Sequence, residues 1–290
     1  MYKSILVPLD GSKLAEGVLP YARFLAEALK LPVDLLHVRD RQTVAPSLYP
    51  TQGADYLRRV AAGLPASLEV SCAVESGSAA EAILDRGSKD PAALIAMATH
   101  GQTGARRWLL GSVAQKVLQS TKNPLLLIRP REDASAPSAA KFASLIVPLD
   151  GSHLAEKTFP HVIDLASRLK LDVTLIRAYA LPTTGYFLAS GILPPAVGEI
   201  GAKIQREVGD YLQSKAQQLR AEGVEKVSFV AVEGTGAEEI IDWARKTADS
   251  LVVMSSHGRS GMGRWVLGSV TDRVVSYSGA PVLVIRPPSI

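Results

Sequence analysis

The chain contains the same domain-sized pattern twice, and this repeat restricts the possible folds more than any other feature of the sequence. Residues 5–12 have the sequence ILVPLDGS, and 140 positions later residues 145–152 have the sequence LIVPLDGS. Near the end of each half, LGSV at 110–113 recurs at 267–270, which is 157 positions later. A repeat of this length indicates one domain present in two copies, not a solenoid of short units. The second copy is therefore 17 residues longer in its middle.

Each copy alternates short apolar runs with helical patterns, which predicts strands and helices in alternation. The runs are rich in β-branched residues and almost continuously apolar, as in parallel strands that are buried on both faces. With right-handed crossovers, this order predicts an α/β fold of two tandem doubly wound, five-stranded parallel-sheet domains, Rossmann-like or flavodoxin-like in type. We expect strands at 4–9, 33–38, 68–74, 92–99 and 124–128, then at 144–149, 172–179, 227–232, 250–255 and 281–286.

The domain boundaries follow from composition. Residues 1–131 form the first predicted domain, 132–141 a linker rich in Pro, Ser, Ala and charge, and 142–290 the second. The helix after the second strand is predicted at 55–62 in the first copy and at 199–221 in the second, so it is cut short in the first. Residues 181–198 are predicted to be a loop, either a surface crossover or a lid or partner surface.

Composition and charge exclude several classes of protein. The net charge is +4 and no dense basic run concentrates it, which argues against nucleic-acid binding. One cysteine, Cys72, excludes an intrachain disulfide and a thiolate metal site, and its apolar neighbours predict a buried strand thiol. No apolar stretch approaches the roughly 20 residues of a membrane span, and the chain enters a predicted strand at once. We therefore expect a cytoplasmic protein with no membrane partner.

An aspartate ends the first predicted strand of each copy, before Gly-Ser and a helix. Asp10 and Asp150 would lie at the carboxyl edge of the sheet, where doubly wound folds bind their ligands. One interpretation is an acceptor for the amino or hydroxyl groups of a nucleoside. The other is turn and helix-cap chemistry, which Asp-Gly-Ser also satisfies.

The segment after the fourth predicted strand is the stronger indication of a ligand site. A glycine there, Gly101 or Gly258, is separated by nine residues from a second glycine, which opens a helix together with the serine after it. Glycine allows a close approach of backbone to an anion, and the free N–H groups of a helix start favour phosphate. The alternative is a loop and a helix cap without a ligand.

The side chains around these glycines have their own alternatives. His100 and His257 have no metal-binding partner nearby in the sequence, so we interpret them as loop-structuring residues. The arginines of the loops either neutralise phosphate or form a solvated basic surface (Arg106, Arg107, Arg259 and Arg264). Trp108 and Trp265 are predicted to pack in the core or between subunits.

Motifs of nucleotide-dependent enzymes are missing. Residues 258–265 come near a P-loop but have Arg-Trp where Lys-Ser/Thr is needed, and there is neither a dinucleotide-binding fingerprint nor a hydrolase nucleophile elbow. No cluster of carboxylates or histidines marks a general base beside the glycines. The sequence therefore predicts no enzyme and leaves slow ATP hydrolysis open.

At these residues the sequence resembles the universal stress protein family in its tandem form. The resemblance rests on VPLDGS at the first strand, LLHV at 35–38, the loop ending in LGSV, and the closing NPLLLIRP and APVLVIRP. It implies five-stranded domains related to adenine-nucleotide-binding α/β folds, which pair through their last strands. Residues 125–128 and 282–285 are then expected to pair within the chain as a pseudo-dimer, which would also cover two sheet edges.

The resemblance also implies ATP as a ligand, with or without Mg²⁺, bound in one branch of the family through G-x₂-G-x₉-G-[S/T]. Ala98 and Ser255 replace the first glycine of that motif, a change that is costly only where φ must be positive. Carried over position by position, the nucleotide-binding residues are Pro8, Asp10, Val38, Met97, Ala98, Gly101, Gly111, Ser112 and Val113, and Pro148, Asp150, Ala178, Met254, Ser255, Gly258, Gly268, Ser269 and Val270.

Two functions follow from the resemblance. The first is an ATP-binding stress-response sensor or regulator with little or no hydrolysis. The second is a nucleotide-free scaffold that acts through protein partners, among which a second copy of the chain is one candidate. Because the shortened helix covers the first domain less completely, we expect its site to be weaker than the second or empty.

Overall fold

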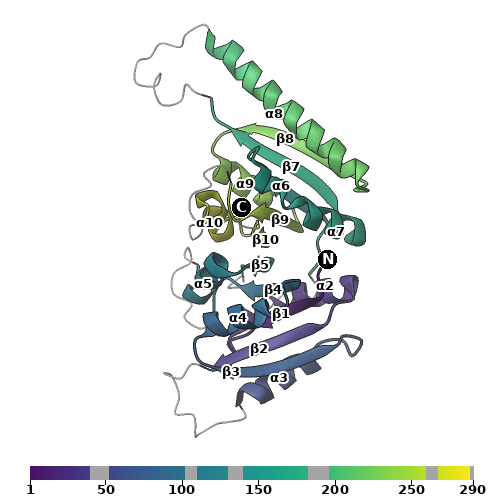
Figure 1. The fold of residues 1–290 in the computed structure, drawn as a ribbon, viewed down its shortest axis with the longest axis vertical. Coiled ribbons are helices and arrows are strands. Elements are labelled where there is room, and N and C mark those ends of the chain that lie inside the picture. Colours follow the sequence, from purple (N-terminus) through teal and green to yellow (C-terminus); the bar gives the residue numbers. More distant parts are fainter. Residues whose placement is uncertain (40–51, 102–109, 130–139, 182–195, 259–266, 288–290) are drawn as a thin grey trace.

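The strands of both halves join in one continuous sheet (Figure 1). The computed structural model describes residues 1–39, 52–101, 110–129, 140–181, 196–258 and 267–287, so most of the predicted 132–141 linker and of the predicted 181–198 loop lies outside the described residues. The ten strands follow the order β3-β2-β1-β4-β5-β10-β9-β6-β7-β8. This arrangement confirms the predicted α/β class and the doubly wound order of each half.

The predicted strands are all present, and no end differs from its prediction by more than two residues. In the first half they are β1 (Ser4–Pro8), β2 (Val33–Arg39), β3 (Val70–Ser76), β4 (Ala93–Ala98) and β5 (Leu125–Ile128). In the second half they are β6 (Ser144–Pro148), β7 (Asp172–Tyr179), β8 (Val227–Glu233), β9 (Ser250–Ser255) and β10 (Val282–Ile285).

The helices cover both faces of the sheet. They are α1 (Lys13–Glu16), α2 (Leu19–Leu29), α3 (Gln52–Ala62), α4 (Ala79–Ser88) and α5 (Ser112–Ser120), then α6 (His153–Glu156), α7 (Phe159–Leu169), α8 (Ala196–Ala221), α9 (Gly236–Lys246) and α10 (Ser269–Tyr277). One apolar layer contains side chains of α2, α3, α7 and α8 and runs through both halves, and the other lies under α4, α5, α9 and α10.

The helix after the second strand of each half differs in length between the halves, as predicted. Helix α3 has 11 residues and α8 has 26, which begin at Ala196 and not at 199. Figure 1 shows α8 lying across β7 and β8 and extending beyond the sheet at one end. No helix in the described ranges is both long and apolar enough to span a bilayer.

The two halves join through their last strands, as the resemblance implied. β5 and β10 pair antiparallel, with Leu126 opposite Leu283, and every residue of both strands is buried. All other strand pairs are parallel. Within each half the chain moves outward from the first strand in one direction and then in the other. The carboxyl end of β1, and likewise of β6, is therefore the point where the strand order reverses.

The prediction of a buried thiol at Cys72 is wrong. Cys72 lies in the middle of β3 and is exposed. Its backbone neighbour in β2 is Leu35, which is fully buried, but β3 is the outermost strand of the sheet that the described residues form. Phe229 has the same place in the other outermost strand, β8, and is 40% exposed. The exposure of Cys72 is thus a property of its edge position, which an apolar sequence context does not reveal.

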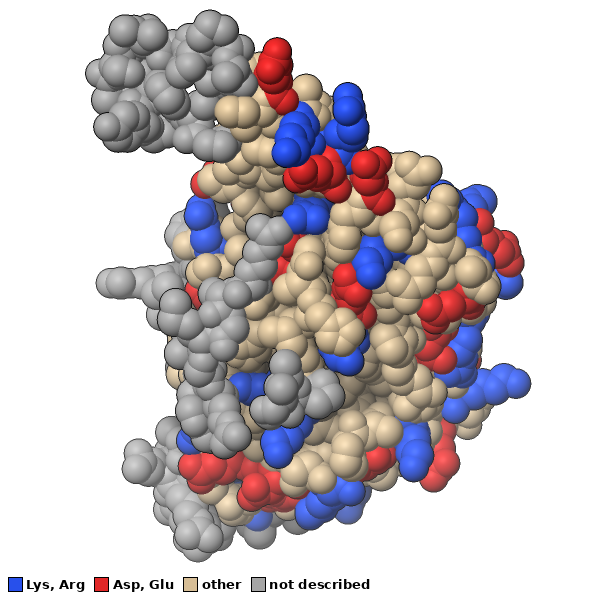
Figure 2. All heavy atoms as spheres, turned by 45° about the horizontal axis from the view of Figure 1, so that its top comes forward, with Lys and Arg blue, Asp and Glu red and all other residues tan. Residues whose placement is uncertain are grey.

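Charged side chains of both signs are mixed over the surface. On the face shown in Figure 2, acidic and basic groups of the described residues alternate without an extended patch of one sign. Many of them form exposed pairs, such as Lys170 with Glu225 at 2.7 Å. This distribution agrees with the small net charge of the sequence.

Candidate functional site

The aspartates at the ends of β1 and β6 organise the turns that follow them. Oδ1 of Asp10 accepts a hydrogen bond from the backbone N–H of Ser12 at 2.9 Å, and Asp150 makes the same contact with Ser152 at 2.8 Å. The serine hydroxyls then cap the short helices α1 and α6. The turn-and-cap interpretation is therefore correct for one carboxylate oxygen of each aspartate, and the other oxygen points to a different neighbour.

That neighbour is the first glycine of the loop after the fourth strand. A Cβ atom built on Gly101 would overlap Oδ2 of Asp10, and one built on Gly258 would overlap Oδ2 of Asp150. Neither glycine has a positive φ, so space and not backbone conformation requires a glycine there. The structure thus brings together the two features that the sequence analysis singled out separately, at the reversal point of each half-sheet.

The second glycine of each loop opens a helix at the same edge. Gly111 is the N-cap of α5 and Gly268 that of α10, and a glycine supplies no side chain to bond the free N–H groups of the first turn. The N–H of Gly111 donates to the Thr99 carbonyl at 2.9 Å, and that of Gly268 to the Ser256 carbonyl at 3.0 Å. These bonds fix each helix start against the end of its neighbouring strand.

The two departures from the family motif cause no backbone strain. Ala98 is the last residue of β4 and Ser255 the last residue of β9, and neither has a positive φ. Both are buried, with 7% of their surface exposed. A small side chain is therefore accommodated at both positions without the conformational cost that a left-handed residue would impose.

The loop histidines are hydrogen-bonded to their neighbours in the chain, which agrees with the interpretation of them as loop-structuring residues. Nδ1 of His100 lies 2.9 Å from the hydroxyl of Thr99, and Nδ1 of His257 lies 2.8 Å from the hydroxyl of Ser256. The backbone N–H of His257 also donates to the hydroxyl of Ser255. These short-range bonds hold the backbone between the strand end and the loop glycine.

The remaining predicted site residues divide into two groups. Those near the surface of the carboxyl edge are Pro8, Val38, Ala178, Ser112, Val113, Ser269 and Val270. Pro148, Met97 and Met254 are buried, and the two methionines pack in the core beneath α4, α5, α9 and α10. The loop arginines and tryptophans (Arg106, Arg107, Trp108, Arg259, Arg264 and Trp265) lie outside the described residues.

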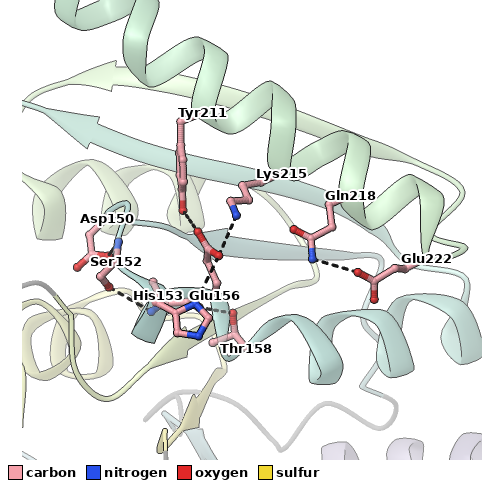
Figure 3. Close-up of polar contacts among 10 residues, drawn as sticks. Asp150, Ser152, His153, Glu156, Thr158, Tyr211, Lys215, Gln218 and Glu222 are labelled. Atoms are coloured by element: carbon pink, nitrogen blue, oxygen red, sulfur yellow. Dashed lines mark hydrogen bonds and ion pairs between the residues drawn. The ribbon is translucent and has the colours of Figure 1, made fainter. Parts of the chain in front are cut away.

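A half-buried polar cluster in the second half was not predicted. Figure 3 shows Glu156, at the end of α6, between two side chains of α8. Tyr211 donates to Oε1 of Glu156 at 2.9 Å, and Nζ of Lys215 donates to Oε2 at 2.8 Å. Burial, together with the hydrogen bond to Glu156, raises the pKa of Tyr211 above its usual range. This cluster fastens α8 over the edge of the sheet beside Asp150.

Arg177 extends this cluster toward the candidate site. Its guanidinium lies 4.8 Å from the centre of the Tyr211 ring, and a Cβ atom on Gly151 would be 2.8 Å from Nη2 of Arg177. The first half has His37 in the same place on its second strand. Nδ1 of His37 is 2.8 Å from the Leu9 carbonyl, and its ring meets Tyr56 edge-on. The positive charges of the two edges are therefore placed differently, because the first half has Arg39 at the end of β2 where the second half has Tyr179.

The sequence did carry one signal for this cluster. Asp-Tyr-Leu occurs at 55–57 and again at 210–212, which is 155 positions later. Glu16 and Glu156 occupy equivalent places in the repeat, and burial with the Glu16 charge raises the pKa of Tyr56 as well. The two glutamates are 140 positions apart in the repeat, and the two tyrosines are 155 apart. The tyrosines therefore align only if most of the extra residues of the second half are placed before Tyr211. The position equivalent to Lys215 is Val60 in the first half, so the lysine of this cluster has no equivalent there.

Comparisons with known proteins agree with this architecture. A family model described as the universal stress protein family matches residues 1–129 and 141–286. A universal stress protein of Mycolicibacterium smegmatis is 25% identical over 98% of this chain and 97% of its own length, and one of Mycobacterium tuberculosis is 26% identical over 97% and 96%. A crystal structure of a universal stress protein from Archaeoglobus fulgidus, 19% identical, covers 98% of both chains with a TM-score of 0.72, which shows a common fold.

Proposed function

We propose that this chain, which belongs to the universal stress protein family, binds an adenine nucleotide at the glycine loop of each half. One observation carries the proposal. The glycine after β4 or β9 lies directly against the aspartate that ends β1 or β6, and a glycine-capped helix begins at the same edge. A carboxylate acceptor and a helix start that no described side chain caps are thereby held at the same edge of the sheet.

Each part of this arrangement suits one part of a nucleotide. The carboxylate of Asp10 or Asp150 is an acceptor for ribose hydroxyls or an exocyclic amino group. The first turn of α5 or α10 presents backbone N–H groups and the positive end of the helix dipole to phosphate. Ser112 and Ser269, exposed in those turns, add a hydroxyl donor. We propose ATP as the ligand, with Mg²⁺ neutralising part of the phosphate charge.

The proposed role is that of a sensor or regulator which binds ATP and hydrolyses it slowly or not at all. The histidines nearest to the loops, His100 and His257, are hydrogen-bonded to the hydroxyls of their neighbours Thr99 and Ser256. The second oxygen of Asp10 or Asp150 is packed against the loop glycine. These groups support a binding site whose polar side chains hold the loop in place.

We propose that the second site is the tighter of the two. Helix α8 is fastened beside Asp150 by the bonds of Glu156 to Tyr211 and Lys215, whereas α3 has Val60 in place of Lys215. A more firmly held wall loses less freedom when the ligand binds.

The test is to count nucleotide on the freshly purified chain by acid release and mass, before and after addition of ATP and Mg²⁺. Two per chain supports both sites, and one per chain supports the tighter second site. The double variant Gly111→Val and Gly268→Val should lose the nucleotide, because each new side chain would press on a carbonyl oxygen 3.1 Å from its Cβ. Gly209→Val in α8, where no atom lies within 4 Å, is the matched control.

Thermal unfolding provides an independent measurement on the same proteins. ATP at about 100 times its dissociation constant should stabilise a single site by about 2.7 kcal/mol. Absence of nucleotide, together with no thermal shift on adding ATP, would overturn the proposal in favour of a scaffold that acts through protein partners. Circular dichroism of the variants separates loss of the site from loss of the fold.

A further inference from the structure

An arginine follows the last strand of each half, and each arginine bonds to a helix of the other half. Nη1 of Arg286, just after β10, donates to the carbonyl of Gln119 at 2.5 Å and to that of Thr121 at 3.3 Å. Nη1 of Arg129, just after β5, donates to the carbonyl of Ser276. The antiparallel pairing of β5 with β10 explains this crossing, because the end of each strand lies beside the start of the other.

The accepting carbonyls lie at the ends of α5 and α10, the two helices that begin at the candidate sites. The last four carbonyls of a helix have no partner within it, and a cation there also stabilises the helix through its dipole. Helix α5 has nine residues, which span about 13 Å at 1.5 Å per residue. Arg286 therefore bonds to the C-terminal end of a short helix, α5, whose N-terminal end is the candidate phosphate site of the first half.

The same arginines are also close to the loops of their own halves. The carbonyl of Ile128 accepts a hydrogen bond from the N–H of Thr99, and that of Ile285 from the N–H of Ser256, each at 2.8 Å. A purely local role would make Arg286 matter to the second site, whereas a crossed role makes it matter to the first. The two roles can be separated by experiment.

The ends of α5 and α10 are not held equally. The carbonyl of Tyr277, the last residue of α10, also accepts a hydrogen bond from Arg245 of α9 at 2.8 Å. In the first half Ser88 has the place of Arg245, and its hydroxyl donates within its own helix to Asp85. Helix α10 therefore keeps one arginine when the other is removed, and α5 depends more strongly on Arg286.

From this geometry we propose that Arg129 and Arg286 are positioning residues, each of which orients the ligand-binding helix of the opposite half. The helix orientation at each site then depends on an arginine of the other half, so both sites require the two halves to be paired. The ligand-binding part of this inference rests on the proposed function.

The experiment measures ATP affinity in the full chain with one site blocked at a time. Gly268→Val leaves the first site, and Gly111→Val leaves the second. Methionine is the replacement for each arginine, because it keeps an unbranched apolar stem and removes the donors. We expect Arg286→Met to weaken ATP binding at the first site by roughly three- to tenfold and to change the second by less than about twofold. Arg129→Met should weaken only the second site, and by less.

Lysine variants provide a rescue. Arg286→Lys keeps a cation at the end of α5 and should restore most of the affinity of the first site. An effect of each methionine variant on its own half, or an equal effect on both halves, overturns the proposal. A general loss of stability would move both sites together, so the crossed pattern is a readout that a merely structural role does not produce.

Hydrogen exchange tests the same inference without a nucleotide. Arg286→Met should speed amide exchange at Gln115, whose N–H bonds to the Gly111 carbonyl at the start of α5, and leave exchange at Asp272, at the start of α10, unchanged. Arg129→Met should do the reverse. Exchange that stays unaltered in the opposite helix overturns the positioning role. If the wild-type chain binds no ATP, the proposed function fails, but the exchange pattern still decides whether each arginine orders the helix of the other half.

Discussion

The phenolic oxygen of Tyr2 is hydrogen-bonded to Nδ1 of His161 at 2.8 Å, and this bond joins the first residues of one half to α7 of the other. Tyr2 is 5% exposed, and its ring lies 5.5 Å from that of His161. Burial lowers the pKa of His161 to about 4. The Asp164 carboxylate acts in the opposite direction, and the N-terminal ammonium, 3.9 Å from Asp164, adds to the lowering. The boundary between the halves thus contains a histidine that is neutral in the folded state.

We predict that mild acid destabilises the chain through His161. Its folded pKa of about 4 lies below the value of about 6.5 expected when unfolded, so the unfolded state binds the proton first. This contribution to stability is complete above about pH 6.5 and is lost as the pH falls toward 4, by at most about 3 kcal/mol. Urea unfolding across this range should show less acid sensitivity for His161→Gln than for wild type.

The matched control for this prediction is His153→Gln. The side chain of His153 is 75% exposed, and we expect its replacement to leave the acid sensitivity of the wild type unchanged. Equal acid sensitivity of wild type and His161→Gln would contradict the prediction.

The contact between Gly101 and Asp10 predicts a strong and specific effect of one added methyl group. Gly101→Ala should destabilise the chain by about 1–3 kcal/mol, because the new Cβ would overlap Oδ2 of the aspartate. Asp10→Ser shortens that side chain and keeps an acceptor for the N–H of Ser12. We therefore expect the double variant to lose less free energy of unfolding than the two single variants lose together. Chemical denaturation of all four proteins measures this difference, which is the coupling energy between the two positions.

The same substitution in open space is the control for that cycle. Gly198→Ala in α8, where no atom lies within 4 Å, should be neutral or stabilising, because alanine favours a helix more than glycine does. Strict additivity of Gly101→Ala and Asp10→Ser would show that the two side chains do not meet.

The Glu156 cluster predicts that the two halves respond differently to the same mutation. Glu156→Gln removes the carboxylate that pairs with Lys215, whose side chain is only 20% exposed, and should cost about 1–3 kcal/mol. Adding Lys215→Met should recover part of this loss, because no unpaired ammonium then remains. Glu16→Gln, with Val60 at the corresponding place, should cost less.

Ultraviolet titration of the tyrosines tests the same cluster independently, through the pKa of Tyr211. The hydrogen bond and charge of Glu156 help to raise the pKa of Tyr211, so Glu156→Gln should lower it. An unchanged titration curve would contradict the placement of Glu156 against Tyr211.

Local patterns were sufficient to predict most of the fold and half of the site. The strands follow from apolar runs such as 144–148, and the repeat located Asp10 and Asp150 with the loop glycines at one edge of the sheet. The packing of Gly101 against Asp10 follows from topology, because β1 and β4 are neighbours in the observed strand order. Doubly wound sheets occur in more than one strand order, so the sequence placed both residues at the carboxyl edge but did not predict their contact.

Contacts that depend on the register of distant elements could not be predicted. Tyr211 meets Glu156 because α8 crosses β7 at a particular level, and the changing repeat offset concealed the pair. Arg286 reaches Gln119 only because β5 and β10 run antiparallel, a feature of the assembled sheet that no local pattern encodes. The exposure of Cys72 likewise depends on which strand forms the edge.

Cys72 offers a final prediction that combines its exposure with its acidity. The thiol is exposed, but partial burial, followed by the negative charge of Asp34, raises its pKa, and Arg58 opposes this shift. Because the thiolate is the reactive species, a disulfide reagent should label the native chain completely but more slowly than a free cysteine. Asp34→Asn should speed the labelling, and Asp85→Asn, an exposed carboxylate on α4, should not. Labelling that requires unfolding would show that the edge of β3 is covered.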